Sequence, residues 1–282
     1  MRRRPRTSAR RGAAAVLVAA LVLAGCDGDD GPAPDDADPT AGPDDAAADG
    51  TDVDDGVELP EVATIDPAEV EGEPDPDTFD GRIASAAADL PEGWEVAVVA
   101  DPVLGPYLIG LPSGASVWRV GDDLEPLVDA STDDAWVRYW EPILTDAGAA
   151  GETSSLRAAV VMPDVDGTEL HLTINATPQQ DLPVGDPSGV AEFFADTFRE
   201  QQLDVEEVTT GQAGDDEVGA VTMTTPDDEF DDGVPRRLRQ WFYPEPDSPV
   251  LWSITCEGPV PSADIVDQAC PVVLASFRSP LR

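Results

Sequence analysis

The pattern of apolar and polar positions changes near residue 80 and divides the chain in two. Residues 27–80 contain 21 acids, no basic residue and one aromatic side chain, Phe79. After residue 80, apolar residues recur with the spacing of strands and helices, and all six Trp and all three Tyr lie there. About 200 residues suit one domain with a proper core. We therefore predict a single folded domain over 81–282.

Strand patterns dominate this domain. Short runs of branched and aromatic side chains between turn residues predict strands over 94–99, 107–111, 115–120, 156–162, 169–176, 203–210, 217–225, 236–243 and 250–256. The runs on either side of the turn at 163–167 predict a hairpin.

Helical spacing predicts helices over 81–90, 133–146, 189–202 and 262–278. Proline is expected to kink two of them, at Pro142 and Pro271. Ser188 is the expected N-cap of the third helix, which carries an apolar stripe rich in Phe. A helix, several antiparallel strands and a closing helix together predict an α+β fold, an antiparallel sheet flanked by helices.

The order of elements from Ser188 onward resembles PsbP-like domains, including LpqN-type bacterial lipoproteins. The resemblance rests on the helix AEFFADTFREQQ, the strands with RQWFY and LWSITC, and a last helix ending in ASFRSP. It covers about the C-terminal third, and the turn GLPSGASVW extends it. It implies a six- or seven-stranded antiparallel sheet with helices on both faces. It also implies a docking or ligand-binding role, and it supplies no common catalytic motif.

The first 26 residues read MRRRPRTSARRGAAAVLVAALVLAGC, a basic head followed by a short apolar run. This order is typical of a secretory signal, and the run is short for a membrane-spanning helix. Leu23-Ala24-Gly25-Cys26 matches the lipobox of bacterial lipoproteins, in which the cysteine receives the lipid. We predict a signal peptide over 1–25, lipidation of Cys26 and a location on the extracytoplasmic face of the bacterial cell membrane. The alternative is an ordinary signal peptide with an incidental cysteine.

Residues 26–80 are predicted to form a lipid-anchored, disordered acidic linker. Low hydrophobicity and high net charge leave too little apolar area to offset chain entropy. A flexible chain of this length has a root-mean-square span of about 40 Å, and self-repulsion extends it. We interpret the linker as a spacer. Cation capture is the alternative, although no window has the spacing of a calcium-binding loop.

Composition excludes several function classes. The chain has 58 acids, 16 basic residues that are all Arg, and a net charge of −42. That charge disfavours nucleic acid as a partner. The absence of Lys excludes Schiff-base and P-loop mechanisms, and a single His disfavours metal sites and Ser-His-Asp triads. We expect no metal, no cofactor and no catalytic motif, although 37 acids after residue 80 leave a pair of catalytic carboxylates open.

Cys256 and Cys270 are the only cysteines beyond the predicted anchor. An even pair outside the cell predicts a disulfide, here between the last strand and the last helix. It closes a loop of about 15 residues and contributes about 3 kcal/mol in the chain-entropy model. A redox or metal pair is the alternative, but it lacks CxxC spacing and a nearby His.

Two further features are candidates for binding. Alternation places His171 on the outer face of its strand, which predicts a solvated residue; a pH-sensitive or metal-binding site is the alternative. On the strand over 236–243, one face carries Arg237, Arg239, Trp241 and Tyr243. Arg beside aromatic rings suits an acidic ligand or a protein partner. The simpler interpretation, which we favour, is charge balance against the acidic loop 227–232, with the tryptophan in the core.

These patterns predict a lipid-anchored cell-envelope protein that acts as a non-enzymatic binding or docking module. Its expected partners are the membrane, through the lipid, and an envelope protein or acidic ligand. Two alternatives remain: a hydrolase of envelope material or polysaccharide that uses paired carboxylates, and a structural protein whose main property is its acidic surface.

Overall fold

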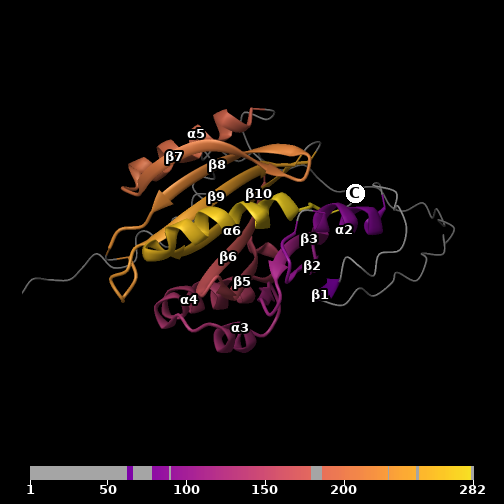
Figure 1. The fold of residues 1–282 in the computed structure, drawn as a ribbon, viewed down its shortest axis with the longest axis horizontal. Coiled ribbons are helices and arrows are strands. Elements are labelled where there is room, and N and C mark those ends of the chain that lie inside the picture. The colour runs from indigo at the N-terminus through magenta and orange to yellow at the C-terminus, as the bar shows by residue number, and fades with distance from the viewer. Residues whose placement is uncertain are drawn as a thin grey trace, which may run out of the picture.

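A computed structural model describes residues 62–65, 78–88, 90–178, 186–227, 229–245 and 248–280. The predicted signal peptide, Cys26 and most of the predicted linker lie outside the described residues. Within the described parts, two antiparallel sheets and the helices packed on them form the fold (Figure 1). No helix in these parts is long and apolar enough to cross a membrane.

The larger sheet has seven strands in the order β4-β5-β6-β10-β9-β8-β7, so that β4 and β7 are its edges. All neighbouring pairs run antiparallel. Its strands are β4 (Ser116–Arg119), β5 (Leu156–Val165), β6 (Thr168–Pro178), β7 (Asp204–Ala213), β8 (Asp216–Thr224), β9 (Arg236–Pro244) and β10 (Val250–Pro259). This sheet confirms the predicted fold class.

Helices cover both faces of the seven-stranded sheet. One face packs against α3 (Glu125–Ala130) and α4 (Asp134–Ala150) near β4 and β5, and against α5 (Pro187–Glu200) near β7 and β8. The opposite face packs against α6 (Ala263–Ser276). In Figure 1, α5 and α4 lie at the top and bottom of the view, and α6 runs between them. The two faces are distinct because alternate residues of each strand point to opposite sides.

The smaller sheet has the order β1-β2-β3, formed by β1 (Val62–Ile65), β2 (Trp94–Asp101) and β3 (Gly105–Pro112). One face of its β2–β3 hairpin joins the core beneath α6, and the other packs on α2 (Phe79–Ala87). A buried ion pair ties the hairpin to the large sheet, with Arg157 Nε 2.5 Å from Asp101 Oδ2. Asp101 also accepts two backbone N–H groups of its own turn, so it fixes the turn as well.

Several local predictions need correction. Strand β1 lies inside the predicted disordered linker, because its four residues find hydrogen-bonding partners on β2. Asp186, and not Ser188, caps α5: its side chain accepts the N–H of Gly189, and Pro187 at the first helical position has no N–H to satisfy. Helix α3 was not predicted, since six residues are too few to establish a helical period.

The predicted disulfide between Cys256 and Cys270 is present. It joins β10 to α6, with the two Cα atoms 5.8 Å apart and both cysteines buried. The bond therefore fixes the last helix to a central strand of the sheet.

Candidate functional site

The predicted Arg and aromatic residues of β9 do share one face of the strand, and that face lies beneath α6. Trp241 is buried in the core, and the largely buried Tyr243 donates its hydroxyl hydrogen to Asp216 Oδ2 at 2.8 Å. Arg237 and Arg239 lie next to α6, where both pair with Asp267. The structure does not bring these four side chains together on an open surface.

Charge balance accounts for the two arginines, although their partners differ from the predicted ones. Arg237 pairs with Glu206 of β7 at 2.5 Å and with Asp267 of α6 at 3.0 Å. Asp232, in the acidic loop 227–232, pairs instead with Arg236, the residue before Arg237. The face that each arginine takes on β9 decides which acids it can reach.

His171 is buried, so the prediction of a solvated residue is wrong. It lies on the predicted face of β6, but α4 covers that face. The imidazole stacks on the Trp136 indole with ring centroids 4.1 Å apart and an interplanar angle of 6°. Its Nε2 lies 2.8 Å from Glu169 Oε1, so in a neutral ring Nε2 carries the hydrogen and Nδ1 the lone pair.

Glu169 organises the loop that leads into α4. Its carboxylate accepts hydrogen bonds from the Ser131 hydroxyl at 2.5 Å and from the N–H and hydroxyl of Thr132 at 2.7 and 2.6 Å. Burial alone would raise the pKa of Glu169, but the hydrogen bonds from His171, Ser131 and Thr132 outweigh it and lower the pKa to about 2. The group is therefore ionised at neutral pH and holds the start of the helix in place.

Glu257 is a second acid on the same sheet face, directly opposite His171 in the β10–β6 pairing. It is fully buried, and its Oε1 accepts the indole N–H groups of Trp136 at 2.9 Å and Trp140 at 3.0 Å. Burial raises the pKa of Glu257, and the nearby His171 and the two indoles only partly oppose it. The sequence could not single out Glu257, because acids are frequent throughout the chain.

A cluster of buried polar side chains extends from His171 and Glu257 across the middle of the sheet, on the face between α4 and α5. It consists of His171, Thr173, Gln240, Ser253, Thr255 and Glu257, which lie on the adjacent strands β6, β10 and β9. Gln240 Nε2 donates to the Ser253 hydroxyl at 2.6 Å. Four of its polar atoms lack a hydrogen-bond partner among the described residues: His171 Nδ1, Thr173 Oγ1, Thr255 Oγ1 and Gln240 Oε1.

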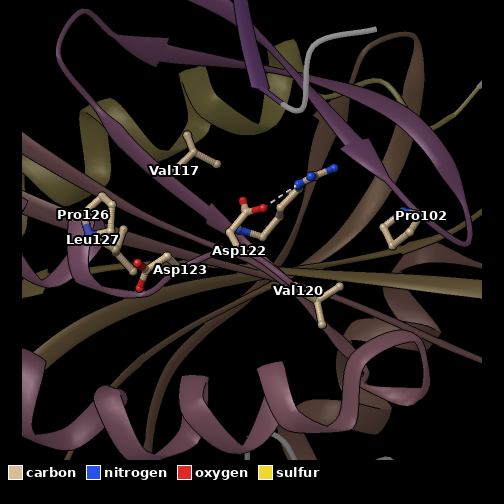
Figure 2. A pocket seen from close by; sticks show the side chains of 9 residues that line it. Pro102, Val117, Val120, Asp122, Asp123, Pro126 and Leu127 are labelled. Atoms are coloured by element: carbon tan, nitrogen blue, oxygen red, sulfur yellow. Dashed lines mark hydrogen bonds and ion pairs between the residues drawn. The ribbon is translucent and has the colours of Figure 1, made fainter. Parts of the chain in front are cut away.

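A surface hollow of about 570 Å³ lies beside the edge strand β4 (Figure 2). Three segments line it: β4 with the turn that follows, the start of α3, and the β2–β3 turn. The lining residues are Pro102, Val117, Arg119, Val120, Gly121, Asp122, Asp123, Pro126 and Leu127. In Figure 2, Asp122 lies between Val120 and Pro102 on one side and Leu127 and Pro126 on the other. We call this feature the β4 hollow.

The turn after β4 is held by its own residues. Trp118 points into the core beneath α4 and donates its indole N–H to the carbonyl of Asp122 at 3.1 Å. Gly121 has a φ of +101°, which side chains rarely adopt, so glycine suits this position. Asp122 accepts the backbone N–H and the Nε–H of Arg119 at 3.2 and 3.0 Å. The Asp122 carboxylate in the β4 hollow therefore has a defined position.

Charge in the β4 hollow is unevenly compensated. Arg119 pairs with Asp122 and also donates to the carbonyl of Ala100 at 2.6 Å. Asp123 is exposed, and its Oδ1 accepts the backbone N–H of Glu125 at 3.1 Å. With one cation and two anions, the hollow carries a net charge of −1 over apolar walls.

Metal binding has no preformed site in the described part of the chain. No group of three or more His, Cys, Asp or Glu side chains there is arranged to hold an ion.

Comparison with known proteins gives a likeness of fold. No protein-family model matches the sequence, and no curated protein matches it significantly. Among solved structures, the chain is similar to LpqN, described as involved in cell envelope biogenesis of Mycobacterium tuberculosis. That match has 10% identity and a TM-score of 0.38, over 67% of this chain and 93% of LpqN.

It is also similar to the cyanobacterial PsbP, CyanoP, from Synechocystis sp. PCC 6803. Here the identity is 9% and the TM-score 0.35, over 61% of this chain and 86% of CyanoP. Both names fall within the family that the sequence resembles. At these TM-scores, neither likeness assigns a function.

Proposed function

We propose that the chain is a lipid-anchored extracytoplasmic protein whose folded domain is a non-enzymatic binding or docking module. The observation that carries the docking role is the β4 hollow, an open recess with apolar walls and positioned charges. Its volume lies within the range of about 300–1,000 Å³ that ligand-binding recesses with a few placed polar groups usually have. The signal-like leader and the lipobox ending at Cys26 support the anchor.

The contacts that three acidic side chains make within the protein favour binding over hydrolysis. A glycosidase of the predicted alternative kind needs two carboxyl groups about 5–10 Å apart across a substrate cleft. Glu257 is enclosed by two indoles, Glu169 is occupied by a loop and a histidine, and Asp122 is paired with Arg119. Each of these carboxyl groups already serves a structural contact.

Cell fractionation tests the anchor. The full chain should sediment with membranes, because two acyl chains on one residue give stable attachment and a single acyl chain does not. Cys26→Ser should move the protein to the soluble extracytoplasmic fraction. Cys26→Ser protein that still sediments with membranes would contradict lipid attachment at this residue.

Cross-linking on intact membranes tests the docking role. The anchored full chain should recover a defined partner, and free untagged domain should compete for it. Recovery of no enriched partner by the wild-type chain would contradict the docking role.

A further inference from the structure

We propose that the β4 hollow binds the ammonium group of a lysine side chain on a basic partner protein. This inference rests on the docking role proposed above and names the chemistry of the partner. Three independent features carry it: the apolar walls, the single uncompensated carboxylate and the charge of the whole domain.

The walls suit an aliphatic stem. The exposed apolar surface of the hollow comes from the partly exposed Val117 and from Pro102 and Pro126 at its sides. Val120 and Leu127 lie behind them and are almost fully buried. A lysine side chain has four methylene groups that pack on apolar surface while its charged end stays near water and polar groups. The hollow offers both kinds of surface within one recess.

The carboxylates select a cation. Asp122 is neutralised by Arg119, whereas the Asp123 side chain, within the described part of the chain, accepts a backbone N–H on Oδ1 and no charged donor. Asp123 Oδ2 thus remains an acceptor beside the apolar walls. A net charge of −1 repels phosphate, carboxylate and other anionic ligands.

Geometry favours lysine over arginine. A guanidinium group binds a carboxylate best through two parallel hydrogen bonds, which need both oxygens. At Asp123 a guanidinium bound through both oxygens would share Oδ1 with the N–H of Glu125, whereas a single-point donor needs only Oδ2. An ammonium group is such a donor.

The rest of the chain points to a partner other than a second copy of itself. After residue 80 the chain has 37 acids and 10 Arg, a net charge of −27, and the whole chain contains no Lys. A field of this sign attracts basic proteins and speeds their approach. A second copy could supply neither a lysine nor a complementary positive surface.

Titration of the full chain with hexalysine, followed by backbone amide NMR shifts at fixed ionic strength, tests the proposal. Shift changes should concentrate on 117–127. Asp123→Asn should weaken binding by about 2- to 5-fold, the effect of removing one exposed ion pair. Asp129→Asn, an equal charge change at an exposed position of α3 outside the hollow, is the matched control and should leave the affinity almost unchanged.

Two further comparisons isolate the chemistry. Val117→Thr keeps the branched shape and the charge, and it should weaken binding if the lysine stem lies on the apolar wall. Hexaarginine should bind the wild-type chain no more tightly than hexalysine.

Equal losses for Asp123→Asn and Asp129→Asn, or shifts spread over all acidic surfaces, would overturn the proposal in favour of general charge attraction. Tighter binding of hexaarginine, or no binding at low salt, would overturn it as well. If Asp123→Asn still recovers the same membrane partner as the wild type, the lysine site is wrong and the docking role stands. If the wild type recovers no partner, the docking role itself fails.

Discussion

Replacing Glu169 by Gln should destabilise the protein at neutral pH and much less in acid. The change keeps the shape of the side chain and removes the charge that accepts hydrogen bonds from the loop before α4 and from His171. The pKa of Glu169 lies at about 2 in the folded protein, against an ordinary 4.5. At about 1.4 kcal/mol for each tenfold change in proton affinity, the difference corresponds to about 3 kcal/mol.

The Glu169 side chain is only 8% exposed, so water screens it little. Gln keeps a carbonyl oxygen that still accepts part of these hydrogen bonds, however, so we expect a smaller loss of about 1 to 2 kcal/mol for Glu169→Gln at pH 7. The folded state binds its proton more weakly than the unfolded state does. The stabilisation is therefore complete above pH 4.5 and disappears as the pH falls toward 2.

Urea unfolding of the wild type and Glu169→Gln at several pH values between 7 and 2.5 measures the effect. The difference in unfolding free energy should shrink steadily below pH 4.5. Glu207→Gln, at an exposed position on β7, is the control and should show no such trend. A difference between wild type and Glu169→Gln that stays constant over the whole pH range would refute the assignment of this carboxylate as a charged anchor.

Three other changes test separate parts of the fold. Burial raises the pKa of Glu257, so the stability of the wild type should fall as the pH rises from 4.5 through that pKa. In urea unfolding, Glu257→Gln should flatten this part of the curve of stability against pH. An unchanged pH profile would contradict the raised pKa of Glu257. Cys256→Ser with Cys270→Ser should lower the unfolding free energy by about 3 kcal/mol, checked against the wild type with and without reductant. Gly219→Ala should cost about 1–3 kcal/mol in thermal unfolding, because a Cβ there would lie 2.5 Å from the backbone oxygen of Pro187, and an unaltered melting temperature would argue against that close approach.

The sequence predicted most strands, because alternation is a local property. On β6 it separated Leu170 and His171 onto opposite faces, as the structure has them. It could not show that α4 would cover the outer face, since that depends on contacts between segments far apart in the chain. The same limit applies to Arg237, whose partners Glu206 and Asp267 come from β7 and α6.

The candidate site was harder to predict than the fold. The β4 hollow combines a turn near residue 102 with residues 117–127, and none of these segments carries a motif. Glu257 and Glu169 are two acids among many, and only their neighbours give them opposite proton affinities. Composition therefore indicated the charge of the surface without indicating which charges are held by a partner.

Strand β1 also determines how the domain would carry mechanical force. Under the lipid anchor proposed at Cys26, tension from the membrane would enter the described part of the fold at Val62, which pairs with Val99 near the end of β2. Pro102 of the β4 hollow follows directly after that end, at the β2–β3 turn. A pull between the membrane and a partner in the hollow would then pass from β1 to β2 and on to β4, an edge strand of the seven-stranded sheet, with the hydrogen bond from Arg119 to the carbonyl of Ala100 as one link. Strand β1 has only four paired residues, so it should peel from β2 first, starting at Val62, while the longer β2–β3 pairing holds.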